Sequence, residues 1–504
     1  MITGKEYLTQ TSVIGVQRIL SKFISLLYWI LITSIFTLHE IGIIAILAIV
    51  VNISVPVTLL RLYTYAEYKI SHSLREKQWN VIHGTILRTI EITLLFSILL
   101  GLGIFFVAKS VVEILQISTE YIFLIQMTGI AVIVSPFFKL SQSFFAGLIQ
   151  GHRIALMSLI QPLTLLISGF FIFPYFRLVG LPIVWIISYF SSFLISLYFI
   201  RDIFVYPRVS PPLKEIFAYS LPLCLAGVVG FFSGFIDQIL VLAFLGVEIL
   251  GLYYLVLKGV AILRYLSSSL LALFFPTMCE SFEYGKSRAQ LVLSRVFKFV
   301  FTVGFPFLTF SSIVAFIFFS FIFFEKIIGG EIIFTILCIA FAINIFREIL
   351  ESVLLAAGYK NVPFQILSIL LIIKIVFLII LLILFPTIDI VGIVYLIGFF
   401  AASIFLFRYF KKHLSLSIQF ISLFKIILAS GIVVIILFLL STVFKGLELL
   451  LISSVSAVIL YPVFISIFKT YNREDINFLK KATPKIVHPF IFFLQKLGRI
   501  EGVD

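Results

Sequence analysis

Long apolar runs follow one another along almost the whole chain, and they constrain its fold more than any other feature. In windows of about 20 residues the sequence is apolar nearly throughout; 62% of its 504 residues are hydrophobic and 12% are charged. A water-soluble domain has no core large enough for so many apolar side chains. We therefore predict an all-α polytopic membrane protein. About fourteen transmembrane helices are expected, at residues 12–36, 41–60, 86–108, 121–148, 154–176, 181–200, 216–243, 250–275, 293–323, 332–357, 363–385, 390–409, 419–441 and 448–468.

Basic residues alternate between rich and poor loops, and this pattern predicts the orientation of the chain. The formal net charge is +14, and most lysines and arginines lie in alternate loops and at both ends of the sequence. By the positive-inside rule, both termini are then cytoplasmic in the cell membrane. The basic surface would face anionic headgroups, so membrane lipids are expected partners and nucleic acid is not. The loops expected outside carry Lys109, Arg177, Lys326 and Lys445.

Three pairs of similar segments indicate that the second half of the chain repeats the first. LHEIGIIAIL resembles GVEILGLYYLV, AGLIQGHRIALMSLI resembles LAAGYKNVPFQILSI, and VGLPIVWIISYF resembles VGIVYLIGFFAA, each at an offset of about 210 residues. The repeat predicts two six-helix bundles related by a pseudo-two-fold axis along the membrane normal. The predicted divisions are an N-terminal bundle (1–203), a cytoplasmic Pro-rich linker (204–215), a C-terminal bundle (216–412), two further helices (413–470) and a cytoplasmic interfacial tail (471–504).

The second bundle begins with a hairpin of two apolar segments, residues 217–275, that carries ionisable groups. Asp237 lies in the first segment, and Lys258 and Arg264 lie in the second. An ionisable group in a membrane helix costs about 2.5–3.5 kcal/mol unless it faces protein or water. Asp237 and Lys258 are each about eight residues from the turn at Leu245–Leu250, so we expect them to pair at equal depth. Arg264 has no carboxylate nearby in the sequence and is the stronger candidate for substrate contact.

The tenth predicted helix has the densest polar face of the chain. Asn344, Arg347, Glu348 and Glu351 are spaced so that they form one stripe of a helix. Arg347 and Glu351 could pair within this helix, and the stripe could then be a self-neutralised seam against another helix.

Other polar side chains inside apolar runs are further candidates for a transport path. Lys374 is isolated at the centre of the eleventh helix, where we expect it to face a cavity, a groove or a phosphate. Arg18 and Lys22 share one face of the first helix, although both could instead extend to the cytoplasmic headgroups. Asn52 lies at mid-span of the second helix, and Arg61 lies at its inner mouth.

The motifs of soluble enzyme chemistry are missing from the sequence. It contains no HExxH, CxxC, GxSxG or P-loop pattern, and its six histidines have no ligand spacing. We therefore predict that the protein is not an enzyme and uses no cofactor or metal, with H⁺ or Na⁺ as an open alternative for energy coupling.

Six short segments follow one another in a specific order and spacing. They are HEIG before a long helix, LLRLYTYAEY, LIQGHR, the block YSLPLCLAGVVGFFSGFIDQILVLAFLGVEILGLYYLV, FFPTM, and LAAGYKNV. In this order, over roughly residues 10–470, they resemble the polysaccharide flippase (Wzx-like) family of the multidrug/oligosaccharidyl-lipid/polysaccharide exporter superfamily.

The resemblance implies a cavity and a groove. Lipid II flippases, which are related, have cavity arginines on helices one, two and eight, and Arg18, Arg61 and Arg264 match these positions here. Their last two helices form a groove for the lipid tail, so the last two helices of this chain are expected to do the same. The acidic residues of the tenth helix depart from the pattern and leave the sign of the cavity charge open.

The predicted function is to flip a polyprenyl-(pyro)phosphate-linked oligosaccharide from the cytoplasmic to the outer leaflet by alternating access. We expect a monomer that serves polysaccharide assembly beside other membrane proteins of that process. Either the membrane potential or an ion would supply the energy. The predicted substrate-binding residues are Arg18, Lys22, Asn52, Arg61, Arg264, Arg347 and Lys374. The residues predicted to couple an ion or to form structural pairs are Asp237, Lys258, Glu348 and Glu351.

Three other functions compete with this prediction. A drug/cation antiporter would have an acidic cavity and about twelve helices, whereas this chain has a cationic bias and two extra helices. A membrane-embedded polysaccharide polymerase or ligase would need a long external loop with catalytic side chains, and all the predicted external loops are short. A membrane scaffold without transport would have no need of charges inside its helices.

Overall fold

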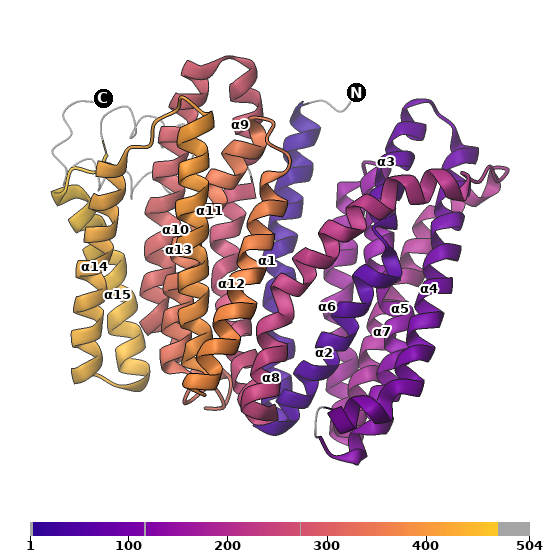
Figure 1. The fold of residues 1–504 in the computed structure, drawn as a ribbon, viewed down its shortest axis with the longest axis horizontal. Helices are drawn as coiled ribbons and strands as arrows, with labels where there is room; N and C mark the ends of the chain where they lie inside the picture. Colours follow the sequence, from indigo (N-terminus) through magenta and orange to yellow (C-terminus); the bar gives the residue numbers. More distant parts are fainter. Residues whose placement is uncertain (1–3, 115–116, 273, 472–504) are drawn as a thin grey trace. The chain divides into compact units, whose positions relative to one another are not determined.

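The computed structural model describes residues 4–114, 117–272 and 274–471, and it is helical throughout this part of the chain (Figure 1). No β-strand occurs among these residues. Short 3-10 turns lie at Thr119–Tyr121, Arg177–Val179 and Arg201–Val205. The fifteen α-helices are α1 (Gly4–Ile35), α2 (Leu38–Leu59), α3 (Leu62–Arg75), α4 (Trp79–Ile114), α5 (Ile122–Gly147), α6 (Gly151–Phe176), α7 (Gly180–Ile200), α8 (Leu213–Ala272), α9 (Phe274–Glu283), α10 (Lys286–Ile322), α11 (Glu331–Ala356), α12 (Val362–Leu384), α13 (Asp389–His413), α14 (Phe420–Val443) and α15 (Gly446–Ile467).

The helices account for every predicted membrane span. Eleven stretches of the described residues are long and apolar enough to cross a membrane. Two of them, Gly151–Val205 and Gly227–Tyr265, each hold two of the predicted spans, and the first predicted span overlaps the shorter apolar helix Leu20–Ile35. The prediction of an all-α polytopic membrane protein is therefore confirmed. The predicted tail lies outside the described residues, apart from Tyr471.

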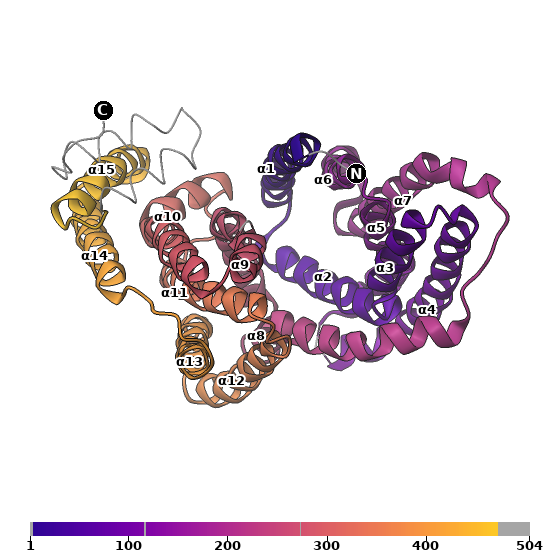
Figure 2. The same cartoon turned by 90° about the horizontal axis from the view of Figure 1, so that it is seen from above.

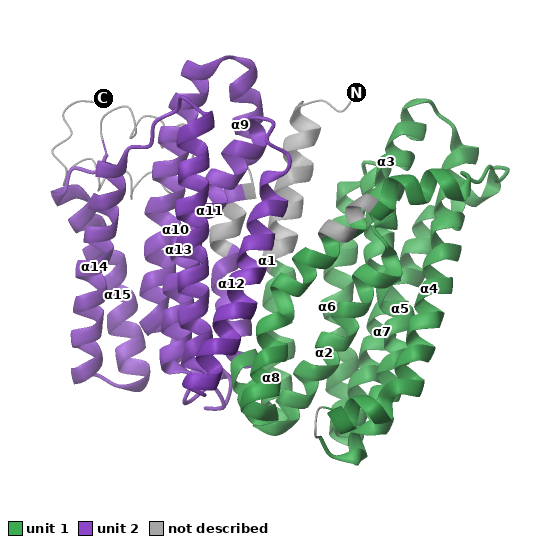
Figure 3. Cartoon of the chain, viewed as in Figure 1, with its two compact units in different colours: residues 1–254 green, residues 255–504 purple. Residues whose placement is uncertain are grey.

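The chain divides into two compact units, Met1–Tyr254 (unit 1) and Leu255–Asp504 (unit 2), which Figure 3 shows in different colours. In unit 1, α1 packs on α6, α4 on α5, and α7 on both α5 and α6. In unit 2, α11 packs between α10 and α13, and α12 packs on α13. The last two helices, α14 and α15, lie together beside α10 (Figure 2).

The predicted turn of the hairpin is a kink inside α8. Gly246 has φ +85° and ψ 179°, a conformation that side chains with a Cβ rarely adopt, and helical geometry resumes after it. The kink lies within the predicted turn Leu245–Leu250 and separates the two apolar segments.

Two glycines let α8 come close to α2 just after this kink. A Cβ on Gly251 would lie 2.2 Å from the carbonyl oxygen of Leu38, and a Cβ on Gly42 would lie 2.0 Å from the carbonyl oxygen of Val247. Because both obstacles are backbone atoms, only glycine fits at either position. One glycine therefore lies on each side of the crossing between α2 and α8.

Candidate functional site

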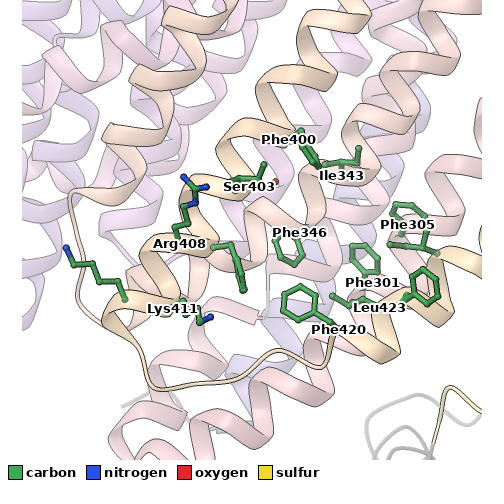
Figure 4. A pocket seen from close by; sticks show the side chains of 15 residues that line it. Phe301, Phe305, Ile343, Phe346, Phe400, Ser403, Arg408, Lys411, Phe420 and Leu423 are labelled. Carbon is green, nitrogen blue, oxygen red and sulfur yellow. The ribbon is translucent and has the colours of Figure 1, made fainter.

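An apolar groove in unit 2 is the largest of the described cavities. It has a volume of about 1040 Å³ and lies among α10, α11, α13 and α14 (Figure 4). Most of its lining is aliphatic or aromatic, and its basic residues come from one end of α13. The lining residues are Phe301, Phe305, Ile343, Phe346, Phe400, Ser403, Ile404, Phe407, Arg408, Lys411, Lys412, Phe420, Leu423, Phe424 and Ile427.

Local sequence explains both the apolar wall and the cationic end of the groove. Lys411 and Lys412 lie in the last turn of α13, where the negative end of the helix dipole favours cations. Phe400 and Phe424 are exposed by 58% and 63%, so the groove presents bare aromatic surface. Figure 4 shows the rings of Phe301, Phe346 and Phe420 gathered apart from Arg408 and Lys411. The groove can therefore hold a long apolar chain whose anionic head lies at the end of α13.

A second feature of unit 2 is a charged network between α8 and α11. The Arg264 guanidinium lies 3.0 Å from Glu348 Oε1, and Asn344 Nδ2 donates a hydrogen bond to the same oxygen at 2.7 Å. Arg347 Nε donates to Asn344 Oδ1 at 2.6 Å, and Arg347 also forms an ion pair with Glu351. The predicted pairing of Arg347 with Glu351 within the helix is confirmed. Two guanidinium groups and two carboxylates make the network formally neutral.

The expectation that Arg264 has no carboxylate partner is wrong. Its partner Glu348 is 84 residues away in the sequence and reaches it from α11, a contact that the local sequence cannot show. The Arg264 guanidinium also lies 4.8 Å from the centre of the Phe341 ring, which adds a cation–π contact. An anionic ligand of Arg264 would therefore compete with Glu348.

A model of the family described as "Polysaccharide biosynthesis protein" matches residues 31–328, which is more than half of the chain. The chain belongs to this family. No curated protein matches its sequence.

Solved structures show which fold the chain shares. One is a lipid II flippase MurJ in an inward closed conformation, with a TM-score of 0.72, 14% identity, and coverage of 90% of this chain and 98% of that one. A second is an inward-facing multidrug resistance MATE transporter of the MOP superfamily, with a TM-score of 0.63, 13% identity, and coverage of 78% and 94%. A third, a MOP superfamily transporter from Pyrococcus furiosus, has a TM-score of 0.58, 12% identity, and coverage of 82% and 96%. The chain has the fold of MOP superfamily transporters.

Arg61 lies at a break between α2 and α3. Leu60 and Arg61 have φ of +43° and +62°, which is unusual for residues with a Cβ. The Arg61 guanidinium donates to the Tyr63 hydroxyl, and a Cβ on Gly227 of α8 would lie 2.7 Å from its Nε. Lys139 Nζ of α5 lies 5.3 Å from the centre of the Tyr63 ring. The break thus brings two cations to one tyrosine, an arrangement that no local sequence pattern indicates.

Lys374, Asp237 and Lys258 are further predicted site residues, and each is described within its own unit. Lys374 is 5% exposed, and its Nζ is 4.0 Å from the centre of the Tyr395 ring of α13; it does not line the groove. Asp237 is buried and accepts a hydrogen bond from the Tyr253 hydroxyl. Lys258 belongs to unit 2, so its pairing with Asp237 stays a prediction.

Three predicted site residues belong to the first two helices. Lys22 is exposed on α1, and the side chain of Arg18 lies outside the part that the structure describes. Asn52 lines a pocket of unit 1 together with side chains of α1, α6, α7 and α8. Among the described residues, no group of three or more His, Cys, Asp or Glu side chains could hold a metal ion.

The groove residues were not among the predicted site residues. The sequence did contain a signal for them, because 59 phenylalanines are present and several recur at helical spacing, as at Phe297, Phe301 and Phe305. Such spacing is also typical of ordinary membrane-facing helices. Arg408, Lys411 and Lys412 were interpreted only as part of the positive-inside pattern.

Proposed function

We propose that this protein flips a polyprenyl-(pyro)phosphate-linked oligosaccharide from the cytoplasmic to the outer leaflet of the cell membrane. The groove of unit 2 is the observation that carries the proposal. Its phenylalanine-rich wall suits a polyprenyl chain, and Arg408, Lys411 and Lys412 suit the phosphate at the head of that chain. A drug-like cation would be repelled by these three charges.

The orientation proposed for the chain agrees with this arrangement. With both termini cytoplasmic, the basic end of α13 faces the cytoplasm, where the phosphate begins its passage. The membrane potential favours outward movement of an anion by about 2.3 kcal/mol per charge for each 100 mV. Asp237, Glu348 or Glu351 could instead bind H⁺ or Na⁺ as a coupling ion, and this stays an alternative within the proposal.

We place the phosphate path next to the internal cations during alternating access. Arg264 and Arg347 are held in the neutral network by Glu348 and Glu351, so a passing phosphate would replace a carboxylate. Arg61 lies against Tyr63 and Gly227, at the break between α2 and α3. Arg18, Lys22 and Lys374 complete the proposed set of cations. The proposal keeps the polyprenyl chain in the groove while the charged head moves.

The test compares neutralised and wild-type protein in proteoliposomes with a fluorescent polyprenyl diphosphate that carries a disaccharide. Changing Arg408, Lys411 and Lys412 together to Gln should slow translocation about a hundredfold, because three charge-assisted contacts are lost. The matched control, Lys109→Gln, removes a charge that is 76% exposed and far from the groove in sequence. Its rate should equal that of the wild type.

Salt dependence provides a second readout on the wild-type protein. The Debye length falls from about 10 Å at 0.1 M salt to about 3 Å at 1 M, so binding of the polyprenyl phosphate should weaken at high salt. Unchanged translocation by the triple variant, or transport of tetraphenylphosphonium in place of the lipid, would contradict the proposed function.

A further inference from the structure

Unit 1 contains a small aromatic pocket that no charged side chain lines. Its volume is about 170 Å³, and its lining comes from α1, α2, α6, α7 and α8. Five of its side chains are aromatic, and they include two of the three tryptophans in the chain. These five are Tyr28, Trp29, Trp185, Tyr189 and Tyr254.

The aromatic side chains hold one another in place around the pocket. The ring of Trp29 meets the edge of Tyr254 at a centroid distance of 5.3 Å, and Tyr28 meets Trp29 at 6.1 Å. Such edge-to-face contacts add about 0.5–1.5 kcal/mol each beyond burial. Tyr254 lies three residues after Gly251, so the glycine crossing of α2 and α8 sets its position beside α2. The pocket is therefore preformed.

Polar groups that can bind a ligand also line the pocket. Tyr28 is 6% exposed, and its hydroxyl, near Trp185, makes no well-formed hydrogen bond with any described group. Buried polar atoms in proteins nearly always form a hydrogen bond, so a ligand that accepts from or donates to this hydroxyl would be stabilised. The Asn52 amide donates one hydrogen bond, to the Ala48 carbonyl oxygen, at 2.7 Å. Ser25 donates to the Ser21 carbonyl oxygen at 2.8 Å. Both side chains keep further hydrogen-bonding capacity.

The charge and size of the pocket select the class of ligand. Its lining contains no Asp, Glu, Lys, Arg or His, so it offers nothing to neutralise a phosphate or to attract a cation over long range. Drug-sized ligands occupy pockets of roughly 300–1,000 Å³, which is larger than this one. A cavity of this volume holds about six waters at liquid density, or one ring that carries hydroxyl groups.

We infer that this pocket binds one uncharged sugar ring of the transported oligosaccharide. The axial C–H bonds of a pyranose pack on the negative face of an aromatic ring, while its hydroxyls need donors and acceptors at the ring edge. Trp29, Trp185 and the tyrosines supply the faces, and Tyr28, Asn52 and Ser25 supply the polar edge. The inference rests on the proposed function for the identity of the substrate, and it adds the sugar subsite that the groove lacks.

A binding experiment tests the site on the full chain in nanodiscs. The substitution Trp79→Phe leaves only the two pocket tryptophans to fluoresce, because Trp79 stacks on Tyr206 outside the pocket. Methyl glycosides of a hexose, an N-acetylhexosamine and a 6-deoxyhexose are titrated against this protein, with tetramethylammonium, which is small enough to enter the pocket, as the cationic comparison. We expect a saturable fluorescence change with at least one glycoside and none with the cation.

Two variants test whether the fluorescence change arises from ligand bound in the pocket. Tyr28→Phe and Asn52→Ala should each weaken glycoside binding about tenfold, because each removes one hydrogen bond to the ligand. The control Tyr175→Phe removes the hydroxyl of a tyrosine that is 84% exposed and should leave binding unchanged. A response to the cation alone, or no response to any glycoside, overturns the inference.

A translocation assay distinguishes a failure of this inference from a failure of the proposed function. In proteoliposomes, Tyr28→Phe and Asn52→Ala should slow the fluorescent polyprenyl diphosphate disaccharide about tenfold and leave the sugar-free polyprenyl diphosphate unaffected. If the wild type moves neither lipid, the proposed function is wrong. If the wild type moves both and the variants match it for the disaccharide, the sugar subsite is wrong and the proposed function stands.

Discussion

The groove of unit 2 and the pocket of unit 1 differ in size, charge and lining. The groove encloses about 1040 Å³, is rich in phenylalanine and carries three cations at one end. The pocket encloses about 170 Å³, has no charged side chain and combines tryptophan and tyrosine with asparagine and serine. A long apolar chain with an anionic head matches the first, and an uncharged polar ring matches the second.

Under the proposed function, this difference lets one fold bind a substrate whose parts have opposite solubility. A single cavity that satisfied a polyprenyl chain, a phosphate and a sugar would have to bury unmatched polar groups somewhere, at a cost of about 1–3 kcal/mol each. Separate sites in separate units avoid that cost. We therefore expect that a substitution in one site weakens binding there and leaves binding at the other site unchanged.

The largest effect is expected from Gly251→Leu, because this substitution disturbs the close approach of α2 and α8 beside the pocket. The new Cβ would lie 2.2 Å from the Leu38 carbonyl oxygen and 2.9 Å from the Gly42 nitrogen, both backbone atoms. Moving α8 away from α2 should lower the free energy of unfolding by about 3 kcal/mol and abolish glycoside binding. Thermal unfolding in nanodiscs and the glycoside titration measure the two effects.

The control for this substitution is Gly103→Leu, at a helical glycine of α4 with no atom within 4 Å of its added Cβ. It should leave stability and glycoside binding unchanged. Below its unfolding temperature, Gly251→Leu should still bind polyprenyl phosphate in the groove. Equal loss of both ligands would show that the two sites are not independent.

An intermediate effect is expected from the network that holds Arg264. Glu348→Gln removes the carboxylate that competes with a phosphate, so polyprenyl phosphate should bind about threefold more tightly, while Arg264→Gln should weaken it. The coupling between the two substitutions should stay below about 1 kcal/mol, because the Arg264 side chain is 45% exposed.

A double-mutant cycle with polyprenyl phosphate as the ligand measures this coupling. Glu448→Gln, an exposed acidic residue in the first turn of α15, gives the same change in net charge outside the network. If Glu448→Gln tightens binding as much as Glu348→Gln, net charge and not the network is responsible. Glycoside binding in the pocket should respond to none of these substitutions.

The smallest effect is expected outside both sites, where α3 meets the start of α8. Lys69 Nζ lies 2.7 Å from Glu215, and this contact, aided by the Tyr65 hydroxyl, holds the pKa of the Glu215 carboxyl below its ordinary value. A lowered folded-state pKa contributes stability above the pKa of the unfolded chain, and that stability is lost as the pH falls through the folded-state pKa. Because Glu215 is partly exposed, the contribution should stay below about 1 kcal/mol.

Thermal unfolding from pH 7 down to pH 3 measures this contribution. Glu215→Gln should be slightly less stable than the wild type at pH 7, and the difference should vanish at the acid end. Groove and pocket binding at pH 7 should be unchanged in this variant. A stability difference that grows as the pH falls would show that the ion pair is not its source.

Much of the fold was predictable because membrane helices depend on length and hydrophobicity alone. The predicted span at 41–60 corresponds to α2, and the turn at Leu245–Leu250 contains the kink at Gly246. Pairing within one helix was also predictable, as Arg347 and Glu351 show, because a spacing of four residues fixes their proximity. The break at Leu60 and Arg61 was not predictable, because no glycine or proline occupies those two positions.

The candidate sites depended on contacts between distant residues. Asn52 was predicted from its place inside an apolar helix, but its aromatic neighbours come from three other helices and share no local pattern. Arg264 was predicted to contact the substrate because no acidic residue lies near it in the sequence. In the structure, Glu348 of α11 forms an ion pair with it. Sequence spacing reports the neighbours along a helix and says nothing about which helix lies opposite.

The sequence by itself determined that this protein is a bundle of membrane helices, because hydrophobic length is a property of the chain. It also contains Gly42 and Gly251, each near the start of an apolar run. Only the tertiary structure decided that these glycines meet, that Arg264 has an acidic partner, and that phenylalanines and cations enclose one groove. The physical reason is that packing between helices is set by side chains far apart in sequence, whose meeting no local pattern records.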